Sequence, residues 1–277
     1  MLSRLVKGAH SSGANAVVMT FHPHPAVVLG GVQDFKCLTT LKERIELLEG
    51  LGIDVVITQE FTRSLANQTA EDFMGVVVSR LGLRHLMVGY DFALGHNREG
   101  NATRLTEIGR KLKYDVEVVD PIRGNDLILS STNIRSELKV GQVSRAAAAL
   151  GRWYSVSGQV VKGDGRGKGI GFPTANVNFP IEKLIPASGI YASWSWVDGR
   201  RYPSATNIGV NPTFTPEKTT PNLETHLIGF DQDLYGQDVK VEFVSRLRDE
   251  IKFQSIEELV SQIKMDVKKC EEILSRS

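Results

Sequence analysis

The chain has 277 residues, of which 41% are hydrophobic and 23% charged, with 33 Lys and Arg against 32 Asp and Glu. This length suits two domains with a core each, and this balanced composition argues against a disordered or fibrous chain and against a basic nucleic-acid-binding face. Because there are only two, widely separated cysteines, no run close to the roughly 20 apolar residues of a membrane span, and no export signal, we expect a cytoplasmic protein without a disulfide scaffold.

Residues 1–151 alternate strand-like apolar runs with amphipathic helical stretches, which predicts βα units around a mostly parallel sheet. We expect strands at 16–21, 53–58, 84–88 and 115–119. Thr40 with Glu43 and Thr69 with Asp72 have the spacing of helix-start pairs. The alternation opens on a helix-like stretch, so the opening strand of a doubly wound sheet is missing from this sequence.

Polar segments follow two of these strands, at the position where α/β domains bind ligands. His22 and His24 follow the first strand, and Asp91 and Asn97 lie after the third. Two histidines two residues apart suggest a metal, but no third ligand is near in sequence, so contact with phosphate or substrate is favoured. A later predicted helix start offers hydroxyls and a guanidinium for a triphosphate, with plain N-capping as the alternative. Its residues are Ser131, Thr132 and Arg135.

Residues 152–277 change to short β-type runs punctuated by Gly and Pro. We expect strands at 154–161, 190–197, 202–208 and 239–247, and their succession without long helices predicts a small antiparallel barrel or sandwich. Ser255 and Glu258 form a capping pair before an amphipathic stretch. A C-terminal helix should therefore close the chain.

The densest motif is the segment 163–171, with five glycines in nine positions. Glycines let backbone N–H groups approach an anion, so a loop that cradles phosphate is one interpretation and a bare glycine-rich hairpin is the other. The spacing fits neither a Walker loop nor a dinucleotide fingerprint. Thr174 and Asn176 follow at once and offer the oxygen ligands that Mg²⁺ prefers, although a turn after Pro173 explains them equally.

Glu224 is a lone carboxylate at the start of a strand-like segment. A transferase that moves a phosphoryl group to an alcohol needs a group to orient the hydroxyl and accept its proton, and Glu224 is a candidate. The alternative is a solvated surface residue. His226 is taken as a structural or partly buried histidine.

Several short segments occur here in the order of one known family. They are residues 21–25, 89–92, 130–135, 171–176, 207–209, 212–214, 224–226 and 234–236. Together they make the chain resemble the bacterial bifunctional riboflavin kinase/FMN adenylyltransferases, also called FAD synthetases. The resemblance covers essentially the whole chain, and GFPTAN at 171–176 is among its most specific parts.

For residues 152–277 the resemblance implies a riboflavin kinase barrel that transfers the γ-phosphoryl group of ATP to the riboflavin 5′-hydroxyl and so gives FMN. By matching position, Glu224 is the catalytic base, Thr174 and Asn176 hold Mg²⁺ with ATP, and Arg248 and Phe253 lie beside the flavin. The glycine loop covers the phosphates. Its implied contacts are Gly163, Gly165, Gly167, Lys168, Gly169 and Gly171.

For residues 1–151 the resemblance implies a Rossmann-like FMN adenylyltransferase domain, which joins AMP from ATP to FMN. FMN and FAD are then products rather than prosthetic groups. The implied site residues are His24, Asp91, Asn97, Ser131, Thr132 and Arg135. Such domains ordinarily begin with a strand that runs into a GxFDGxHxGH segment, whose histidines and helix N-terminus bind the triphosphate. No HxGH occurs in these 277 residues.

We therefore expect an incomplete α/β domain followed by a β-barrel with a C-terminal helix. Three explanations for the missing segment remain: a start site placed too far downstream, a trimmed chain, or natural loss of the second activity. The first is favoured. The chain as given should make FMN with little or no FAD. The alternatives are a fully bifunctional enzyme and a non-catalytic regulator that binds a flavin or a nucleotide. An adenylyltransferase of another pathway would leave residues 173–176 unexplained. The sequence indicates no oligomeric state.

Overall fold

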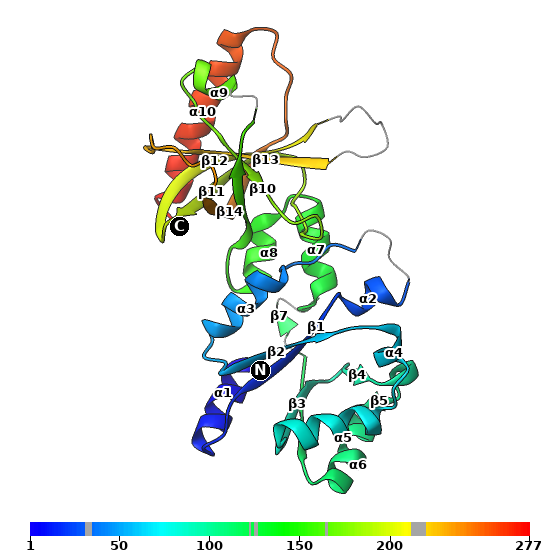
Figure 1. Ribbon diagram of the computed structural model, residues 1–277. Helices are drawn as coiled ribbons and strands as arrows, with labels where there is room; N and C mark the ends of the chain where they lie inside the picture. Colours follow the sequence, from blue (N-terminus) through cyan, green and yellow to red (C-terminus); the bar gives the residue numbers. More distant parts are fainter. Residues whose placement is uncertain (31–34, 122, 125–126, 164–165, 212–219) are drawn as a thin grey trace. The chain divides into compact units, whose positions relative to one another are not determined.

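A computed structural model describes residues 1–277 except 31–34, 122, 125–126, 164–165 and 212–219 (Figure 1). The described chain forms two compact units. The first comprises Met1–Phe35 and Thr39–Ile128, and the second comprises Lys36–Leu38 and Leu129–Ser277. Among the described residues, no helix combines the length and the apolar character needed to cross a membrane.

The first unit contains the expected βα alternation. Its longer helices are α1 (Leu2–Ser11), α3 (Leu41–Glu49), α5 (Ala70–Leu81) and α6 (Ala102–Leu112). Its longer strands are β1 (Val17–His22), β2 (Val55–Glu60), β3 (His85–Gly89) and β6 (Asp115–Val119). β1 pairs with β2 and β3 with β6, both in parallel. Among the residues that are described, these are two separate two-stranded sheets.

Short elements connect them: α2 (Pro25–Val28), α4 (Arg63–Ala66), β4 (Ala93–Leu94), the 3₁₀ turn η1 (His96–Arg98), β5 (Gly100–Asn101), β7 (Arg123–Gly124) and β8 (Leu127–Ile128). Side-chain caps fix where the long helices begin. The Thr40 hydroxyl accepts from the Glu43 backbone N–H at 3.2 Å while the Glu43 carboxylate accepts from the Thr40 N–H at 2.9 Å, which is the predicted capping box. Thr69 accepts from the Asp72 N–H in the same way at the start of α5.

The second unit is built on a closed six-stranded antiparallel barrel with the order β10-β13-β12-β11-β14-β9. The strands are β9 (Tyr154–Val161), β10 (Ala175–Asn178), β11 (Gly189–Val197), β12 (Arg200–Asn211), β13 (Thr220–Leu227) and β14 (Asp238–Arg248). The predicted barrel is thus confirmed, and four of its strands lie where the sequence placed them. β10 is not among the predicted strands, and β13 begins four residues before Glu224, where the sequence analysis placed the start of a strand-like segment.

Helices α7 (Ser131–Lys139), α8 (Val143–Leu150), α9 (Arg166–Gly169) and α10 (Ile256–Leu274) complete this unit. Ser255 caps α10 as expected, since its hydroxyl accepts from the Glu258 N–H at 3.2 Å. Leu138 and Val143 belong to the same hydrophobic core as the barrel residues Tyr154 and Phe243. For this reason α7 and α8 group with the barrel in packing, although we placed the boundary of the functional domains after residue 151.

A short segment from early in the chain also belongs to the second unit. In this strap, Lys36–Leu38, the Cys37 N–H donates to the Glu182 carbonyl at 2.6 Å and the Cys37 carbonyl accepts from the Leu184 N–H at 2.9 Å. The Lys183 ammonium donates to the Leu38 carbonyl at 2.8 Å. Backbone pairing therefore joins the strap to the loop that follows β10.

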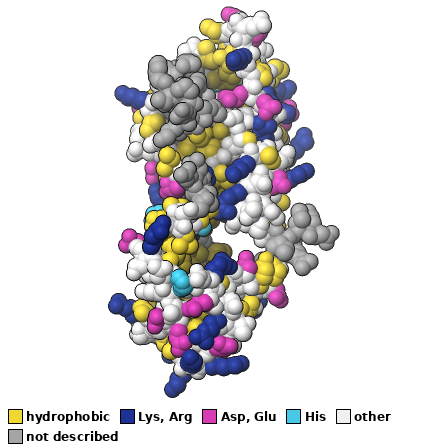
Figure 2. Space-filling view, turned by 90° about the vertical axis from the view of Figure 1, so that its right-hand side faces the viewer, with side chains coloured by type: hydrophobic (Ala, Val, Ile, Leu, Met, Phe, Trp, Pro, Cys, Tyr) yellow, Lys and Arg dark blue, Asp and Glu magenta, His cyan; other side chains and the backbone are white. Residues whose placement is uncertain are grey.

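Charge is evenly spread on the face in Figure 2, where Lys and Arg side chains are interspersed with Asp and Glu rather than gathered in one basic patch. This agrees with the near balance of 33 basic and 32 acidic residues in the whole chain.

Candidate active sites

Glu224 stands on the outer face of the barrel, in the middle of β13. Its strand neighbours Leu223 and Thr225 are fully buried and point inward, so the alternation of a strand turns Glu224 outward. Across the sheet, Glu224 is the register partner of Asn176 on β10 and of Asn207 on β12. One carboxylate thus lies between two carboxamides from strands that are distant in sequence.

Two side chains contact the Glu224 carboxylate directly. The Asn222 Nδ2 donates to Oε1 at 2.6 Å, and the Thr174 hydroxyl lies 3.4 Å from Oε2. Glu224 is half-buried rather than freely solvated, and Thr174 is exposed. Among the described residues no group of three His, Cys, Asp or Glu side chains could hold a metal ion, so oxygen donors such as those of Thr174 and Asn176 must be considered instead.

Behind Glu224, a chain of buried hydroxyls crosses the barrel interior. The hydroxyls of Ser193 and Thr206 lie 2.6 Å apart, Thr206 and Thr225 2.9 Å, and Thr225 and Ser195 3.1 Å. All four residues are fully buried. Because hydrogen bonds in a low-dielectric interior are strong, this chain ties β11, β12 and β13 together directly beneath the carboxylate.

The glycine-rich segment folds against the same residues. A Cβ atom at Gly163 would lie 2.1 Å from the Asn176 Nδ2, and one at Gly167 would lie 2.3 Å from the Phe172 carbonyl oxygen. Gly171 has a φ of +85°. Gly163 and Gly167 need glycine for close approach to other protein atoms, and Gly171 needs it for a left-handed backbone. Gly165 and the side chain of Lys168 lie outside the described residues, and the phosphate contacts of the loop stay a prediction.

A cavity of about 430 Å³ opens beside Thr174. It is lined by Gly167, Pro173, Thr174, Thr225, Phe230 and Tyr235, among others. His226 borders this region from β13, where its Nδ1 lies 2.7 Å from the Pro173 carbonyl and its ring meets Phe172 edge-on at 5.5 Å. His226 therefore holds the segment that carries Thr174, which agrees with the structural role expected for it.

The structure gives Arg248 a partner that the sequence analysis did not foresee. Its Nε and Nη2 contact the Asp266 carboxylate at 3.1 and 2.6 Å, and its Nη1 donates to the Asp249 carbonyl at 2.9 Å. Asp266 lies on α10 and is buried. Arg248 thus fastens the C-terminal helix to β14. A flavin contact by Arg248, and by the half-buried Phe253, stays a prediction.

In the first unit, His24 is the N-cap of α2. Its Nδ1 accepts from the Ala26 N–H at 3.2 Å, and its ring stacks on Phe35 with centroids 4.1 Å apart. Asp91 and Asn97 are exposed on the loop after β3. Asn97 adopts a φ of +51°, and its Nδ2 lies 3.0 Å from the His96 ring. Each predicted residue is thus placed at a strand end or on the loop that follows one.

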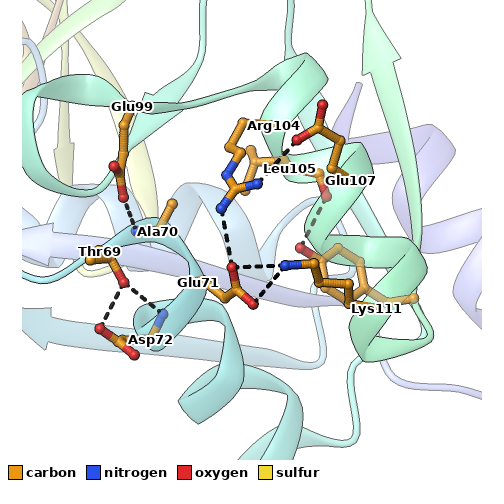
Figure 3. A network of polar contacts seen from close by, with 10 residues as sticks. Thr69, Ala70, Glu71, Asp72, Glu99, Arg104, Leu105, Glu107 and Lys111 are labelled. Atoms are coloured by element: carbon orange, nitrogen blue, oxygen red, sulfur yellow. Dashed lines mark hydrogen bonds and ion pairs between the residues drawn. The ribbon is translucent and has the colours of Figure 1, made fainter.

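The loop that carries Asn97 is fixed to the start of α5 (Figure 3). The Glu99 carboxylate accepts from the Ala70 N–H at 2.8 Å. A Cβ atom at Gly95 would lie 2.7 Å from the Ala70 backbone nitrogen, and one at Gly100 would lie 2.6 Å from the Ala70 Cβ. The loop therefore packs directly against the N-terminus of α5. Beside it, Glu71 on α5 pairs with Arg104 and Lys111 on α6 at 3.1 and 3.2 Å, which joins the two helices.

The remaining predicted residues lie on the first turns of α7 in the second unit. The Ser130 hydroxyl caps this helix by accepting from the Asn133 N–H at 3.2 Å, so the exposed Ser131 and Thr132 occupy its first turn. Arg135 donates from Nε to the Lys36 carbonyl at 3.1 Å, which anchors the strap. That these residues line one site with His24, Asp91 and Asn97 stays a prediction.

Sequence reasoning missed Asn222, although a signal for it was present. Residues two apart on a strand share a face, so a strand through Glu224 would have placed Asn222 beside it. The missing step was to begin the strand at 220 rather than at Glu224. Asn207 lies on β12, within the strand predicted at 202–208, and its Oδ1 is buried without a hydrogen-bond partner among the described residues.

Comparison with known proteins adds two family matches. A riboflavin kinase family model matches residues 150–274, and an FAD synthetase family model matches residues 1–133. A bifunctional riboflavin kinase/FMN adenylyltransferase of Bacillus subtilis is 36% identical over 260 residues, which are 93% of this chain and 82% of that protein. One of Escherichia coli K12 is 33% identical over 269 residues, covering 95% and 85%. A crystal structure titled as a macrolide-efflux protein of Streptococcus pneumoniae is 29% identical with a TM-score of 0.88, and the match covers 98% of this chain and 88% of that one.

Proposed function

The chain belongs to the family of bifunctional riboflavin kinase/FMN adenylyltransferases, and from this premise we propose how its two units divide the work. The barrel transfers the γ-phosphoryl group of ATP to the 5′-hydroxyl of riboflavin and releases FMN and ADP. The α/β unit joins AMP from a second ATP to FMN and releases FAD and pyrophosphate. Riboflavin, FMN and ATP are its partners, and because neither cysteine is in a disulfide, the enzyme suits the reducing cytoplasm.

In the kinase reaction, the 5′-oxygen of riboflavin forms a bond to the γ-phosphorus while the bond from that phosphorus to the bridging oxygen of ADP breaks. Glu224 orients the attacking hydroxyl and accepts its proton through the carboxylate. The glycine segment, fixed against Asn176 and Phe172, directs backbone N–H groups at the phosphates. Catalysis then rests on in-line positioning rather than on a covalent enzyme intermediate.

The donor set beside Glu224 fits Mg²⁺. The Thr174 hydroxyl and the Asn176 carboxamide are oxygen donors at the mouth of the glycine segment, and hard oxygen ligands are what this ion takes in phosphate sites. Thr174 and Asn176 would hold the ion with ATP. When bound, Mg²⁺ supplies positive charge that offsets the charge on the phosphate oxygens.

The observation that supports the kinase assignment is the register of β10 and β13, which sets Glu224 against Asn176, while Thr174 approaches the Glu224 Oε2 at 3.4 Å. The direct test compares Glu224→Ala and Asn176→Ala with the parent chain in riboflavin phosphorylation. We expect Glu224→Ala to lower kcat with little effect on folding, and Asn176→Ala to weaken the use of Mg²⁺ and ATP. Unchanged turnover in Glu224→Ala would remove it from the base role.

For adenylylation, His24, Asp91 and Asn97 from the first unit, with Ser131, Thr132 and Arg135 from α7, are the proposed site residues. The 277 residues contain no HxGH segment, whose histidines the family resemblance makes central to this step. We therefore propose that this polypeptide forms FMN and forms FAD slowly or not at all. A fully bifunctional polypeptide is the alternative.

One experiment separates these outcomes. The purified chain is incubated with Mg²⁺ and ATP and either riboflavin or FMN, and the flavins are resolved chromatographically. FMN without FAD supports the proposal, whereas FAD formed from FMN at a rate comparable with phosphorylation overturns it. Binding of riboflavin without turnover would instead support a flavin-binding regulator. His24→Ala should leave FMN formation intact, since it belongs to the other unit.

A further inference from the structure

We propose that Asn222 is a positioning residue for phosphoryl transfer, which acts by holding the Glu224 carboxylate in its reactive orientation. The inference rests on the proposed function, in which Glu224 is the base. It goes beyond the family motif, because Asn222 lies outside the segments on which the resemblance depends.

The geometry specifies which group donates. An ionised carboxylate has only acceptors, so the 2.6 Å contact between Asn222 and Glu224 must be an N–H of the amide donating to Oε1. Both side chains leave β13 on its outer face, two residues apart. Their contact is therefore built into the strand and needs no loop to close over it.

The contact leaves one carboxylate oxygen for chemistry. With Oε1 bound to Asn222, Oε2 is the oxygen that faces Thr174, at 3.4 Å. Thr174 in turn lines the cavity beside the glycine segment. A glutamate side chain has three rotatable bonds, and a fixed Oε1 removes most of that freedom before substrate arrives. Asn222 thus selects Oε2 as the oxygen that receives the substrate proton.

Asn222 meets no competing side chain from its direct neighbour on β12. Its register partner on β12 is Gly209, which presents no side chain to it. A Cβ atom at Gly209 would lie 2.8 Å from the Glu250 Oε1, so a larger residue there would disturb this face. The amide of Asn222 therefore lies along its own strand toward Glu224.

The test is a double-mutant cycle on kinase kinetics in the full chain. Asn222→Ala should lower kcat by about ten- to hundredfold with KM for riboflavin and for ATP changed less than about twofold, because misorientation of the base affects the chemical step. In the Glu224→Gln background, Asn222→Ala should cause no further loss, since it acts only through Glu224. Asn222→Asp, which keeps the volume but replaces the donor by an acceptor, should lose at least as much as Asn222→Ala.

Asn178→Ala is the matched control, because Asn178 has the same side chain on β10 of the same barrel but is exposed. It should keep the parent kcat, and thermal melting should show each variant folded. Asn222→Ala or Asn222→Asp with parental kcat, or losses that add in the Glu224→Gln background, would overturn the inference. Parental kcat in Glu224→Gln would overturn the proposed base itself, which is a distinguishable result.

Discussion

Thr206→Val should destabilise the second unit, because Thr206 is the middle of the buried hydroxyl chain. Valine keeps the shape and removes the hydroxyl that bonds Ser193 at 2.6 Å and Thr225 at 2.9 Å. Thr225 retains Ser195 at 3.1 Å, and Ser193 retains the Ser204 carbonyl at 3.3 Å, so neither neighbour is left wholly unpaired. Two lost bonds at about 1 kcal/mol each then give a loss of about 2 kcal/mol in the free energy of unfolding.

Thr206→Ser is the control that separates hydroxyl from packing. It keeps the hydroxyl and loses one buried methyl group, which costs about 1 kcal/mol. The assay is urea unfolding followed by tryptophan fluorescence. All three tryptophans, Trp153, Trp194 and Trp196, lie in the second unit, so the signal reports on the barrel even in the full chain. If valine proved less destabilising than serine, the hydroxyl chain would contribute less than the methyl packing, and the reasoning would be refuted.

Three further outcomes are expected from other parts of the chain. Gly167→Ala should raise KM for ATP in the kinase reaction without loss of the fold, because the new Cβ atom would lie 2.3 Å from the Phe172 carbonyl oxygen and displace the segment before Thr174. An unchanged KM for ATP would contradict this. The backbone N–H of Ala16, and then His10, lower the pKa of Asp54, so the ionised carboxylate stabilises the fold fully above its ordinary pKa and loses this effect as the pH falls through the lowered value. The melting temperatures of Asp54→Asn and the parent should therefore converge toward low pH, and a difference that stays constant would contradict this. Burial raises the pKa of the Cys270 thiol to about 12, so iodoacetamide at pH 8 should label Cys270 only after unfolding, as peptide mass mapping can determine.

Local chemistry made much of the fold predictable. The capping box at Thr40 and Glu43 and the Ser255 cap appear as the sequence predicted, because a cap depends on residues within one turn. Strands such as β9 and β11 were also found, since their apolar alternation is continuous. β10 escaped because it is short and follows Pro173 at the end of the glycine-rich segment. The strand at β13 was expected only from Glu224 on, since Pro221 and Asn222 before it are typical of loops.

Long-range packing accounts for what the sequence could not indicate. The flavin contact that the resemblance implies for Arg248 stays a prediction, but no sequence pattern indicates that β14 brings Arg248 against Asp266, 18 residues later on α10, at 2.6 Å. The apolar faces of α7 and α8 fit a βα pattern equally well, yet Leu138 and Val143 insert into the core of the barrel. Neither contact leaves a mark in sequence spacing, because each depends on which elements meet after folding.

The candidate kinase site combines both kinds of information. Residue type and order make Glu224, Thr174 and Asn176 candidates, but their proximity depends on the pairing of β10 with β13, which are nearly 50 residues apart and antiparallel. The glycine segment meets the same strand, since a Cβ atom at Gly163 would lie 2.1 Å from the Asn176 Nδ2, so this position accepts no side chain without a shift of Asn176. A substitution that shifted β13 by one residue would turn Glu224 inward and Thr225 outward. The buried hydroxyl chain through Thr225 opposes that shift, so the barrel interior and the outward carboxylate constrain one register together.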